Sequence, residues 1–534
     1  MSSDESTFKP ALTLMSGRIA AFAITFVTPV ILVRVFTQSE FGTYKQLLLM
    51  TYTLFFIAQC GLAESLFYFL PKNPDNAGRY ALNSLAMLLI SGVACTVGLL
   101  VNPDAIANWM SNRALARYMP VIGAYLVFML MGTVLEITMI SRKRYKLAAA
   151  TYVSTDLFRA FFLVIPALIT RSLMWALAAS VVFLFARVCA IFGYFRWEFG
   201  HGLRLDRALL KEQCAYALPF TLSVIVQVIQ QNYHQYAVAF NFDAAAFAIY
   251  SVGCLQIPLV DFMATPASNV MMVRMTEHLR DKDSRELLPI WHDTTRKLAL
   301  MFFPFVGLLV VNAYGLITLL FTDRYAASVP IFMVWSLSIL MAAFQTDGVL
   351  RVFADIRFLF KVNLVRLVLL VLTMGWFLST FGLMGAVLIT LVGILLAKIM
   401  AMVRIREVLQ TTFRNVLPWK DLGGSLAVAV LSAIPAILVN ATLDWPKLVL
   451  LPISGTAYLV TYLTLVLMFG LISESERAAI RRGLYVWNRR SVEPERQASL
   501  TGGSAVDVRC DGASGSERCG ILRRIGRRVR NAAA

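Results

Sequence analysis

Charged side chains are scarce in this sequence, and the shortage sets its class. Only 15% of the 534 residues are Asp, Glu, Lys or Arg, while 58% are hydrophobic and the mean hydropathy is +0.69. A water-soluble chain carries about 25% charged residues, so this chain has too few polar side chains to cover a soluble surface. The composition therefore predicts a polytopic membrane protein. It excludes a soluble enzyme, a nucleic-acid-binding domain and a secreted disulfide scaffold.

Metal-binding and redox residues are also few. The chain has four histidines and seven cysteines, with no Cys-x-x-Cys pair and no Cys/His spacing typical of a metal site. Single cysteines inside apolar segments behave as small buried hydrophobes. We therefore expect no metal and no cofactor. The sequence also has no GxxxxGK[ST] motif, so it contains no P-loop with which to hydrolyse ATP.

Apolar runs long enough to span a bilayer recur along the chain, since about 20 apolar residues are needed for one span. Fourteen runs meet this condition, at 11–36, 43–70, 80–101, 117–140, 148–170, 172–195, 214–240, 245–272, 298–321, 328–350, 360–380, 382–404, 422–441 and 448–472. Helices are the expected form, because an open sheet would leave backbone groups unpaired in lipid. The sequence thus predicts an all-α membrane protein with about 14 transmembrane helices.

Positive charge is distributed unevenly between the turns that join these runs. The turns after even-numbered runs are basic, for example Arg142-Lys143-Arg144, whereas the turns after odd-numbered runs carry few Lys or Arg. Because the cytoplasmic loops hold the excess of Lys and Arg, both termini are predicted to be cytoplasmic. The net charge of +18 then reflects topology, and no nucleic-acid partner is expected. Residues 473–534 are predicted to form a basic cytoplasmic tail, largely disordered.

Runs one to six resemble runs seven to twelve. The matching pairs are Phe41-Gly-Thr-Tyr44 with Phe247-Ala-Ile-Tyr250 (offset 206), Pro120 with Pro330 (210), Asp156-x-x-Arg159 with Asn363-x-x-Arg366 (207), and Leu173-Met-x-Ala176 with Leu383-Met-x-Ala386 (210). The constant order and nearly constant offset indicate a duplication. Because six is even, both copies enter the membrane from the same side, so an axis along the membrane normal is expected to relate them, with a cavity between.

This duplication divides the chain into predicted parts. They are an N-lobe at 1–200, a C-lobe at 201–406, two additional helices at 407–472 and the tail at 473–534.

Ionisable residues inside the predicted helices are the first candidates for a binding site, because a charge near a helix centre costs about 2.5–3.5 kcal/mol on insertion scales. Arg18 and Glu64 lie at similar depth in two antiparallel helices and can pair. The planar fork of arginine suits phosphate, so Arg18 is a candidate ligand for a pyrophosphate, held or released by Glu64. The alternative is a structural ion pair or simple snorkelling.

A second candidate group is the repeated pair of positions in runs five and eleven. Asp156 and Arg159 are three residues apart and share a helix face, and Asn363 and Arg366 occupy the matching places. We expect Arg159 and Arg366 to face each other across the cavity and to bind an anion. The alternative is that Asp156 neutralises Arg159 and that both serve packing.

Polar residues also form a stripe along run seven, at Ser223, Gln227, Gln230, Gln231 and His234. Amides and a neutral imidazole can hydrogen-bond sugar hydroxyls, which predicts a cavity lining. Interhelical hydrogen bonds, worth about 0.6 kcal/mol each, are the alternative. Asp261, in the middle of run eight, is a candidate proton or cation coupling site, or the counter-charge of a cavity arginine, and a packing hydrogen bond is the alternative.

The duplicated six-helix runs with two extra helices, together with the segment RVFTQSEFGTYKQ at 34–46, resemble the polysaccharide and lipid-linked oligosaccharide flippases of the MOP exporter superfamily. The resemblance covers about residues 8–472. It implies a non-enzymatic carrier in the bacterial inner membrane that works by alternating access. The implied substrate is a glycan on a polyprenyl-pyrophosphate carrier, whose lipid tail stays in the bilayer. Membrane lipid and polysaccharide-assembly proteins are the other implied partners.

Three other functions fit the sequence less well. An ion-coupled multidrug antiporter of the same superfamily would need a net acidic cavity, whereas Arg18, Arg159 and Arg366 outnumber the unpaired acids. A membrane glycan polymerase or ligase would need a large outer loop, and the longest predicted outer loop has about 16 residues (101–117). A purely structural scaffold would not need the polar stripe of run seven.

Overall fold

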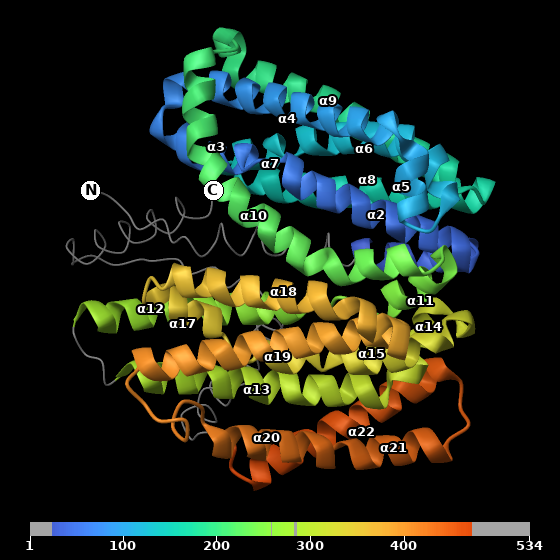
Figure 1. The fold of residues 1–534 in the computed structure, drawn as a ribbon, viewed down its shortest axis with the longest axis vertical. Coiled ribbons are helices and arrows are strands. Elements are labelled where there is room, and N and C mark those ends of the chain that lie inside the picture. Colours follow the sequence, from blue (N-terminus) through green and yellow to red (C-terminus); the bar gives the residue numbers. More distant parts are fainter. Residues whose placement is uncertain (1–23, 258, 282–285, 473–534) are drawn as a thin grey trace, which may run out of the picture. The chain divides into compact units, whose positions relative to one another are not determined.

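The computed structural model of the protein describes residues 24–472 except 258 and 282–285, and within these residues all regular structure is helical (Figure 1). Arg18 and the predicted tail lie outside the described residues. Eleven helical stretches are long and apolar enough to cross a bilayer, from Gln38–Lys72 to Lys447–Met468. The prediction of an all-α polytopic membrane protein is confirmed, while the number fourteen stays a prediction.

The first half of the fold begins with a short apolar helix, Ile24–Val35. The helices that follow are α2 (Gln38–Ala58), α3 (Leu62–Lys72), α4 (Ala77–Val101), α5 (Pro103–Trp109), α6 (Met119–Gly132), α7 (Val134–Ser141), α8 (Tyr145–Thr170) and α9 (Leu173–Phe199).

The second half begins at α10 and is followed by three helices that lie outside the repeat. Its helices are α10 (Arg207–Asn241), α11 (Ala244–Gly253), α12 (Leu259–Arg280), α13 (Leu287–Val311), α14 (Ala313–Phe321), α15 (Val329–Ser336), α16 (Ser338–Ala342), α17 (Thr346–Val352), α18 (Ile356–Phe381) and α19 (Leu383–Val408). The last three are α20 (Trp419–Leu431), α21 (Ala433–Thr442) and α22 (Lys447–Met468).

One predicted run is not a continuous helix. The run 245–272 is divided between α11 and α12, because the chain leaves the helical conformation at residues 254–257. Pro258 follows this stretch in the sequence, and the residue before a proline is biased away from the α conformation. Hydropathy alone does not detect such a break, since both sides of it are apolar.

The matched turns of the repeat begin matched helices. Thr37 caps α2 by accepting from the Glu40 N–H, while the Glu40 carboxylate accepts from the Thr37 N–H, a capping box. Asp243 stands 206 residues later and caps α11 by accepting from the Ala246 N–H at 2.8 Å. The Phe-Gly-Thr-Tyr segment and its counterpart therefore fall within the first two turns of α2 and α11.

Backbone geometry repeats along the two halves as well. Positive φ angles occur at Ser111, Lys143 and Arg171 and recur at Thr322, Ala354 and Gly382, each 211 residues later. The turn around Lys143 also has the same hydrogen bonds as the turn around Ala354. This coincidence supports the duplication independently of residue identity.

Helix α10 contacts both halves and crosses from one to the other (Figure 1). Near its start, the buried Gln213 donates to the Ser84 hydroxyl at 3.0 Å and to the Tyr80 carbonyl at 3.3 Å, in the first half. Further along, Gln230 donates to the Asn363 carbonyl at 3.2 Å, in the second half. The beginning of α10 thus packs with the first half, although run seven opens the second copy of the repeat.

Docking of α22 on α13 gives a stability prediction. Tyr458 is fully buried and donates to the Ala429 carbonyl at 2.8 Å, and a Cβ on Gly307 of α13 would lie 2.1 Å from its hydroxyl oxygen. We expect Gly307→Ala to cost about 1–3 kcal/mol through overpacking, seen as a lower melting temperature of the purified protein. Gly455→Ala is the control, because its nearest neighbour would be Leu308 at 3.8 Å. Equal melting temperatures for the two variants would contradict this packing.

Candidate functional site

A cavity of about 600 Å³ lies between the two halves. Its wall is formed by the first described helix and by α2, α6, α8 and α9 from one half, and by α10, α11 and residues 254–256 from the other. The lining includes the tyrosines Tyr44, Tyr52 and Tyr125, the amides Gln231, Asn232, Gln235 and Gln256, and the hydroxyl groups of Thr25, Thr28, Thr51, Ser180 and Ser251. The cavity is therefore polar although it lies among apolar helices.

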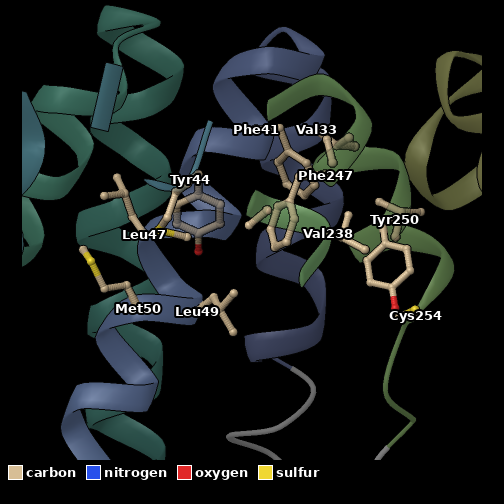
Figure 2. Close-up of a cluster of buried hydrophobic side chains, with 14 of the residues drawn as sticks. Val33, Phe41, Tyr44, Leu47, Leu49, Met50, Val238, Phe247, Tyr250 and Cys254 are labelled. Atoms are coloured by element: carbon tan, nitrogen blue, oxygen red, sulfur yellow. The ribbon is translucent and has the colours of Figure 1, made fainter. Parts of the chain in front are cut away.

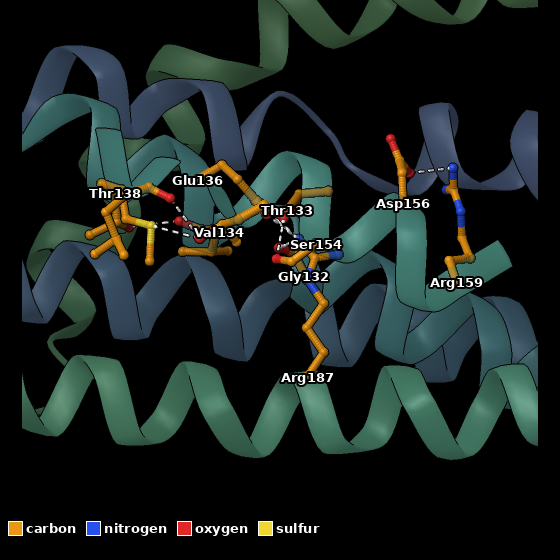
Figure 3. A network of polar contacts seen from close by, with 12 residues as sticks. Gly132, Thr133, Val134, Glu136, Thr138, Ser154, Asp156, Arg159 and Arg187 are labelled. Carbon is orange, nitrogen blue, oxygen red and sulfur yellow. Dashed lines mark hydrogen bonds and ion pairs between the residues drawn. The ribbon is translucent and has the colours of Figure 1, made fainter. Parts of the chain in front are cut away.

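Two basic side chains and one acid contribute charge to this lining. Arg159 pairs with Asp156 at 2.5 Å on the same face of α8, as the spacing predicts, and lies 3.5 Å from the Thr25 hydroxyl (Figure 3). Lys45 of α2 lies 5.5 Å from the centre of the Phe41 ring and has no ion-pair partner among the residues that the structure describes. Among the described lining residues, positive charge therefore exceeds negative charge by one.

Lys45 was not identified from the sequence. It follows the Phe-Gly-Thr-Tyr segment directly, and its counterpart at an offset of 206 is Ser251, which lines the same cavity. The repeat could have found this position, because the matched segments place both residues one step after a matched tyrosine. The sequence does not show which face of α2 lines the cavity.

The predicted polar stripe of α10 divides between two faces. Gln231 lines the cavity together with Asn232 and Gln235. Gln230 and His234 face the second half instead, where His234 is buried with its Nδ1 2.7 Å from the Tyr250 hydroxyl.

Of the two remaining stripe positions, the structure describes the side chain of Gln227 alone. Gln227 is exposed and is not among the lining residues, and the side chain of Ser223 lies outside the described set. The stripe divides because α10 has protein on more than one side, so polar residues are needed for packing as well as for the cavity.

Arg366 and Asn363 do not line the cavity in this structure. The Arg366 side chain lies across α19 at Gly393, whose Cβ would be 3.4 Å from Arg366 Cγ. Its Nε is buried without a hydrogen-bond partner among the described residues. The expected opposition of Arg159 and Arg366 across the cavity is thus not seen in this conformation.

Glu64 and Asp261 also lie away from the cavity lining. Glu64 is exposed in the first turn of α3 and accepts from Gln59 Nε2 at 2.8 Å. Asp261 is exposed in the first turn of α12, where a carboxylate stabilises the helix N-terminus. Asp261 therefore begins a helix after the break at 254–257, and its role in ion coupling stays a prediction. No group of three or more His, Cys, Asp or Glu within the described residues is arranged to hold a metal.

Close contacts join the two halves at the end of the cavity where α2 and α11 begin. A Cβ on Gly42 would lie 1.7 Å from the Ala244 carbonyl oxygen, so the two helix starts touch through backbone. Arg34 donates to the Leu319 and Leu320 carbonyls at 2.6 and 2.7 Å.

The apolar side chains of the same end form part of the main core. Figure 2 shows Phe41 and Phe247, which the repeat relates, in the seam between α2 and α11. Both are fully buried. The halves are therefore firmly packed together on this side of the cavity.

Comparison with known proteins agrees with this architecture. Residues 31–330, more than half of the chain, match the profile of a family described as "Polysaccharide biosynthesis protein". The chain belongs to this family. No curated protein matches it by sequence.

Solved structures share the fold at low identity. The lipid II flippase MurJ in an inward closed conformation has a TM-score of 0.67 and 11% identity, covering 86% of this chain and 98% of that one. An inward-facing multidrug resistance MATE transporter of the MOP superfamily has a TM-score of 0.56 and 14% identity, covering 75% and 98%. A MOP superfamily transporter from Pyrococcus furiosus has a TM-score of 0.51 and 13% identity, covering 75% and 95%. This polysaccharide biosynthesis family member is thus a multi-pass membrane protein with the MOP fold.

Proposed function

We propose that this polysaccharide biosynthesis protein is a flippase that translocates a lipid-linked oligosaccharide, or a related polysaccharide precursor, by alternating access. One observation carries the proposal: the cavity between the halves combines two basic groups with many amides and hydroxyls. Lys45 and Arg159 suit the pyrophosphate of a polyprenyl carrier, since charge-assisted hydrogen bonds to phosphate are strong. The amides of Gln231, Asn232 and Gln235 suit sugar hydroxyls. Membership of the family and likeness to a lipid II flippase support it.

The arrangement of contacts suggests which state the structure represents. The basic turns Arg142-Lys143-Arg144 and their counterparts place the starts of α2 and α11 on the outer side, if the positive charges are cytoplasmic. The joined end around Gly42 is then the outer end, and the substrate enters from the cytoplasm. In the reverse state the halves separate at this end and the headgroup leaves outward, while the lipid tail stays in the bilayer.

The other predicted residues take secondary parts in this proposal. Arg366, whose Nε has no hydrogen-bond partner in the described part of the chain, would meet the anion in another state, with Asn363 beside it. Glu64 would hold or release Arg18 near the cytoplasmic entrance, and Asp261 would serve ion coupling. The lobes 1–200 and 201–406, the added helices 407–472 and the cytoplasmic tail complete the proposed organisation.

The proposed setting is the bacterial inner membrane, with both termini in the cytoplasm and no enzymatic activity. A lipid-linked glycan, membrane lipid and polysaccharide-assembly proteins are the proposed partners. The multidrug antiporter remains the second candidate because MATE transporters share the fold. An excess of positive charge repels cationic drugs, so the cavity favours the flippase.

Reconstitution distinguishes the two candidates. Proteoliposomes containing the full chain and a fluorescent lipid-linked oligosaccharide are expected to expose the glycan on the opposite leaflet faster than protein-free vesicles, measured by lectin access. Empty vesicles and vesicles with heat-denatured protein are the controls. Uptake of ethidium driven by a proton or sodium gradient, without glycan translocation, would contradict the flippase and support the antiporter.

A further inference from the structure

Each half contains a cation that reaches a break in a neighbouring helix. In the first half, Arg187 of α9 donates to the Gly132 carbonyl at 3.1 Å, where α6 gives way to α7, and to both Glu136 oxygens at 2.6 and 2.7 Å (Figure 3). In the second half, Lys398 of α19 donates to the Phe344 carbonyl at 2.8 Å, between α16 and α17.

Lys398 has two further partners at this break, and one of them is a carboxylate. It donates to the Thr346 hydroxyl at 3.1 Å, and it lies 3.7 Å from Asp347 Oδ1.

The acid and the basic residue at the first break occupy the same positions in the repeat as those at the second break. Glu136 and Asp347 are 211 residues apart, and so are Arg187 and Lys398. The same offset relates the left-handed turns at Lys143 and Ala354 just beyond the two breaks. A break leaves backbone carbonyls without helical partners, and the cation satisfies one of them while the nearby carboxylate balances its charge.

The two breaks differ in length and in how closely their ion pairs are buried. The Glu136 and Arg187 side chains are 5% and 14% exposed, and a single residue, Thr133, separates α6 from α7 in a helical conformation. The Asp347 side chain is 63% exposed and its ion pair is long, and three residues, 343–345, separate α16 from α17. The first break is thus held by two short contacts between buried side chains, whereas the second break is longer and its carboxylate is exposed.

We propose that the break at 343–345 is a hinge closed by Lys398, about which α17 moves relative to α15 and α16, and that the Gly132 break is fixed. The hinge is linked to the cavity by packing. A Cβ on Gly348 of α17 would lie 2.8 Å from Ser268 Oγ and 2.9 Å from Met271 Cε of α12. Helix α12 in turn begins just after the lining residues 254–256, so a movement of α17 is transmitted to the cavity wall. This inference does not depend on the transported substrate.

Hydrogen–deuterium exchange of the full chain in lipid nanodiscs tests the hinge, read by mass spectrometry of peptides from each break. In the wild type we expect amides at 343–348 to exchange at least about tenfold faster than amides at 132–137, since hydrogen exchange reports local opening. Lys398→Met should speed exchange at 343–348 about tenfold further and leave 132–137 unchanged. Lys398→Arg, which keeps a donor and the charge, should restore the wild-type rate.

The Glu136–Arg187 ion pair of the first half provides a comparison with Lys398. Glu136→Gln keeps the shape and a hydrogen-bond acceptor, and it is expected to lower the melting temperature of the whole protein more than Lys398→Met does. Equal exchange at the two breaks in the wild type would overturn the hinge. So would a Lys398→Met variant whose exchange rises uniformly along the chain, because Lys398 would then act only in global stability.

Discussion

Replacing Gly42 with leucine is expected to abolish the closure of the two halves at the starts of α2 and α11. The Cβ atom alone would lie 1.7 Å from the Ala244 carbonyl oxygen, 2.5 Å from its carbon and 3.2 Å from its Cα. All three are backbone atoms, so no side-chain rotation relieves the clash, and the helices must separate by more than 1 Å. Because Phe41 and Phe247 fill the same seam, separation also opens the apolar core.

Cross-linking across this seam measures the effect. Ser111 of the first half and Phe240 of the second lie in contact, the Ser111 hydroxyl 2.5 Å from the Phe240 carbonyl. Cysteines introduced at both positions, in a chain without other cysteines, should be joined by a short bifunctional thiol reagent. We expect at least about a tenfold loss of cross-linking when Gly42→Leu is added, together with loss of glycan translocation. A carrier that cannot close one end cannot alternate.

Gly193→Leu is the matched control for the Gly42 variant. It also lies within a long helix, α9, but a Cβ there would have no neighbour within 4 Å among the residues that the structure describes. Cross-linking and translocation should stay near wild-type values. Unchanged cross-linking in Gly42→Leu would show that the seam adapts and that Gly42 does not govern closure.

The sequence predicts those features of the fold that depend on one helix at a time. Hydropathy predicts the spans because each must bury about 20 apolar residues in lipid. The Asp156–Arg159 pair follows from the spacing of one helix face, and the structure places both residues on the cavity. The capping residues Thr37 and Asp243 act through their own turns, which explains why the motif after run one and its copy begin helices.

Features that depend on tertiary placement could not be predicted in this way. The stripe of α10 is continuous in sequence, yet Gln231 faces the cavity while Gln230 and His234 bind the second half. The sequence does not mark Lys45 as a cavity residue, because a lysine near the start of a membrane helix can also extend its side chain to the membrane surface. The pairing of Arg187 with Lys398 was not predicted either, because the offset of 211 residues that relates them came from the backbone turns of the structure, whereas the sequence matches had offsets of 206 to 210.

Removal of the two cavity cations is expected to have the largest effect on ligand binding. Each charge-assisted hydrogen bond contributes about 1.5–3 kcal/mol, and about 1.4 kcal/mol corresponds to a tenfold change in Kd. Lys45→Met should therefore weaken binding of a prenyl diphosphate by about ten- to a hundredfold. Asp156→Asn with Arg159→Met should do the same without leaving an unpaired acid. Farnesyl diphosphate is a suitable probe, followed by quenching of intrinsic fluorescence.

Two controls separate recognition of the anion from general damage to the protein. Lys72→Met removes a lysine that donates to the Tyr68 hydroxyl at 3.0 Å on α3, away from the cavity, and binding should be unchanged. Farnesol shares the prenyl chain but lacks the phosphates, so its weaker binding should not respond to Lys45→Met. Equal losses for farnesol and farnesyl diphosphate would mean that Lys45 shapes the cavity instead of binding the anion. Full affinity in the combined Lys45 and Arg159 variant would place the anion elsewhere, and Arg366, whose Nε has no hydrogen-bond partner among the described residues, would be the next position to change.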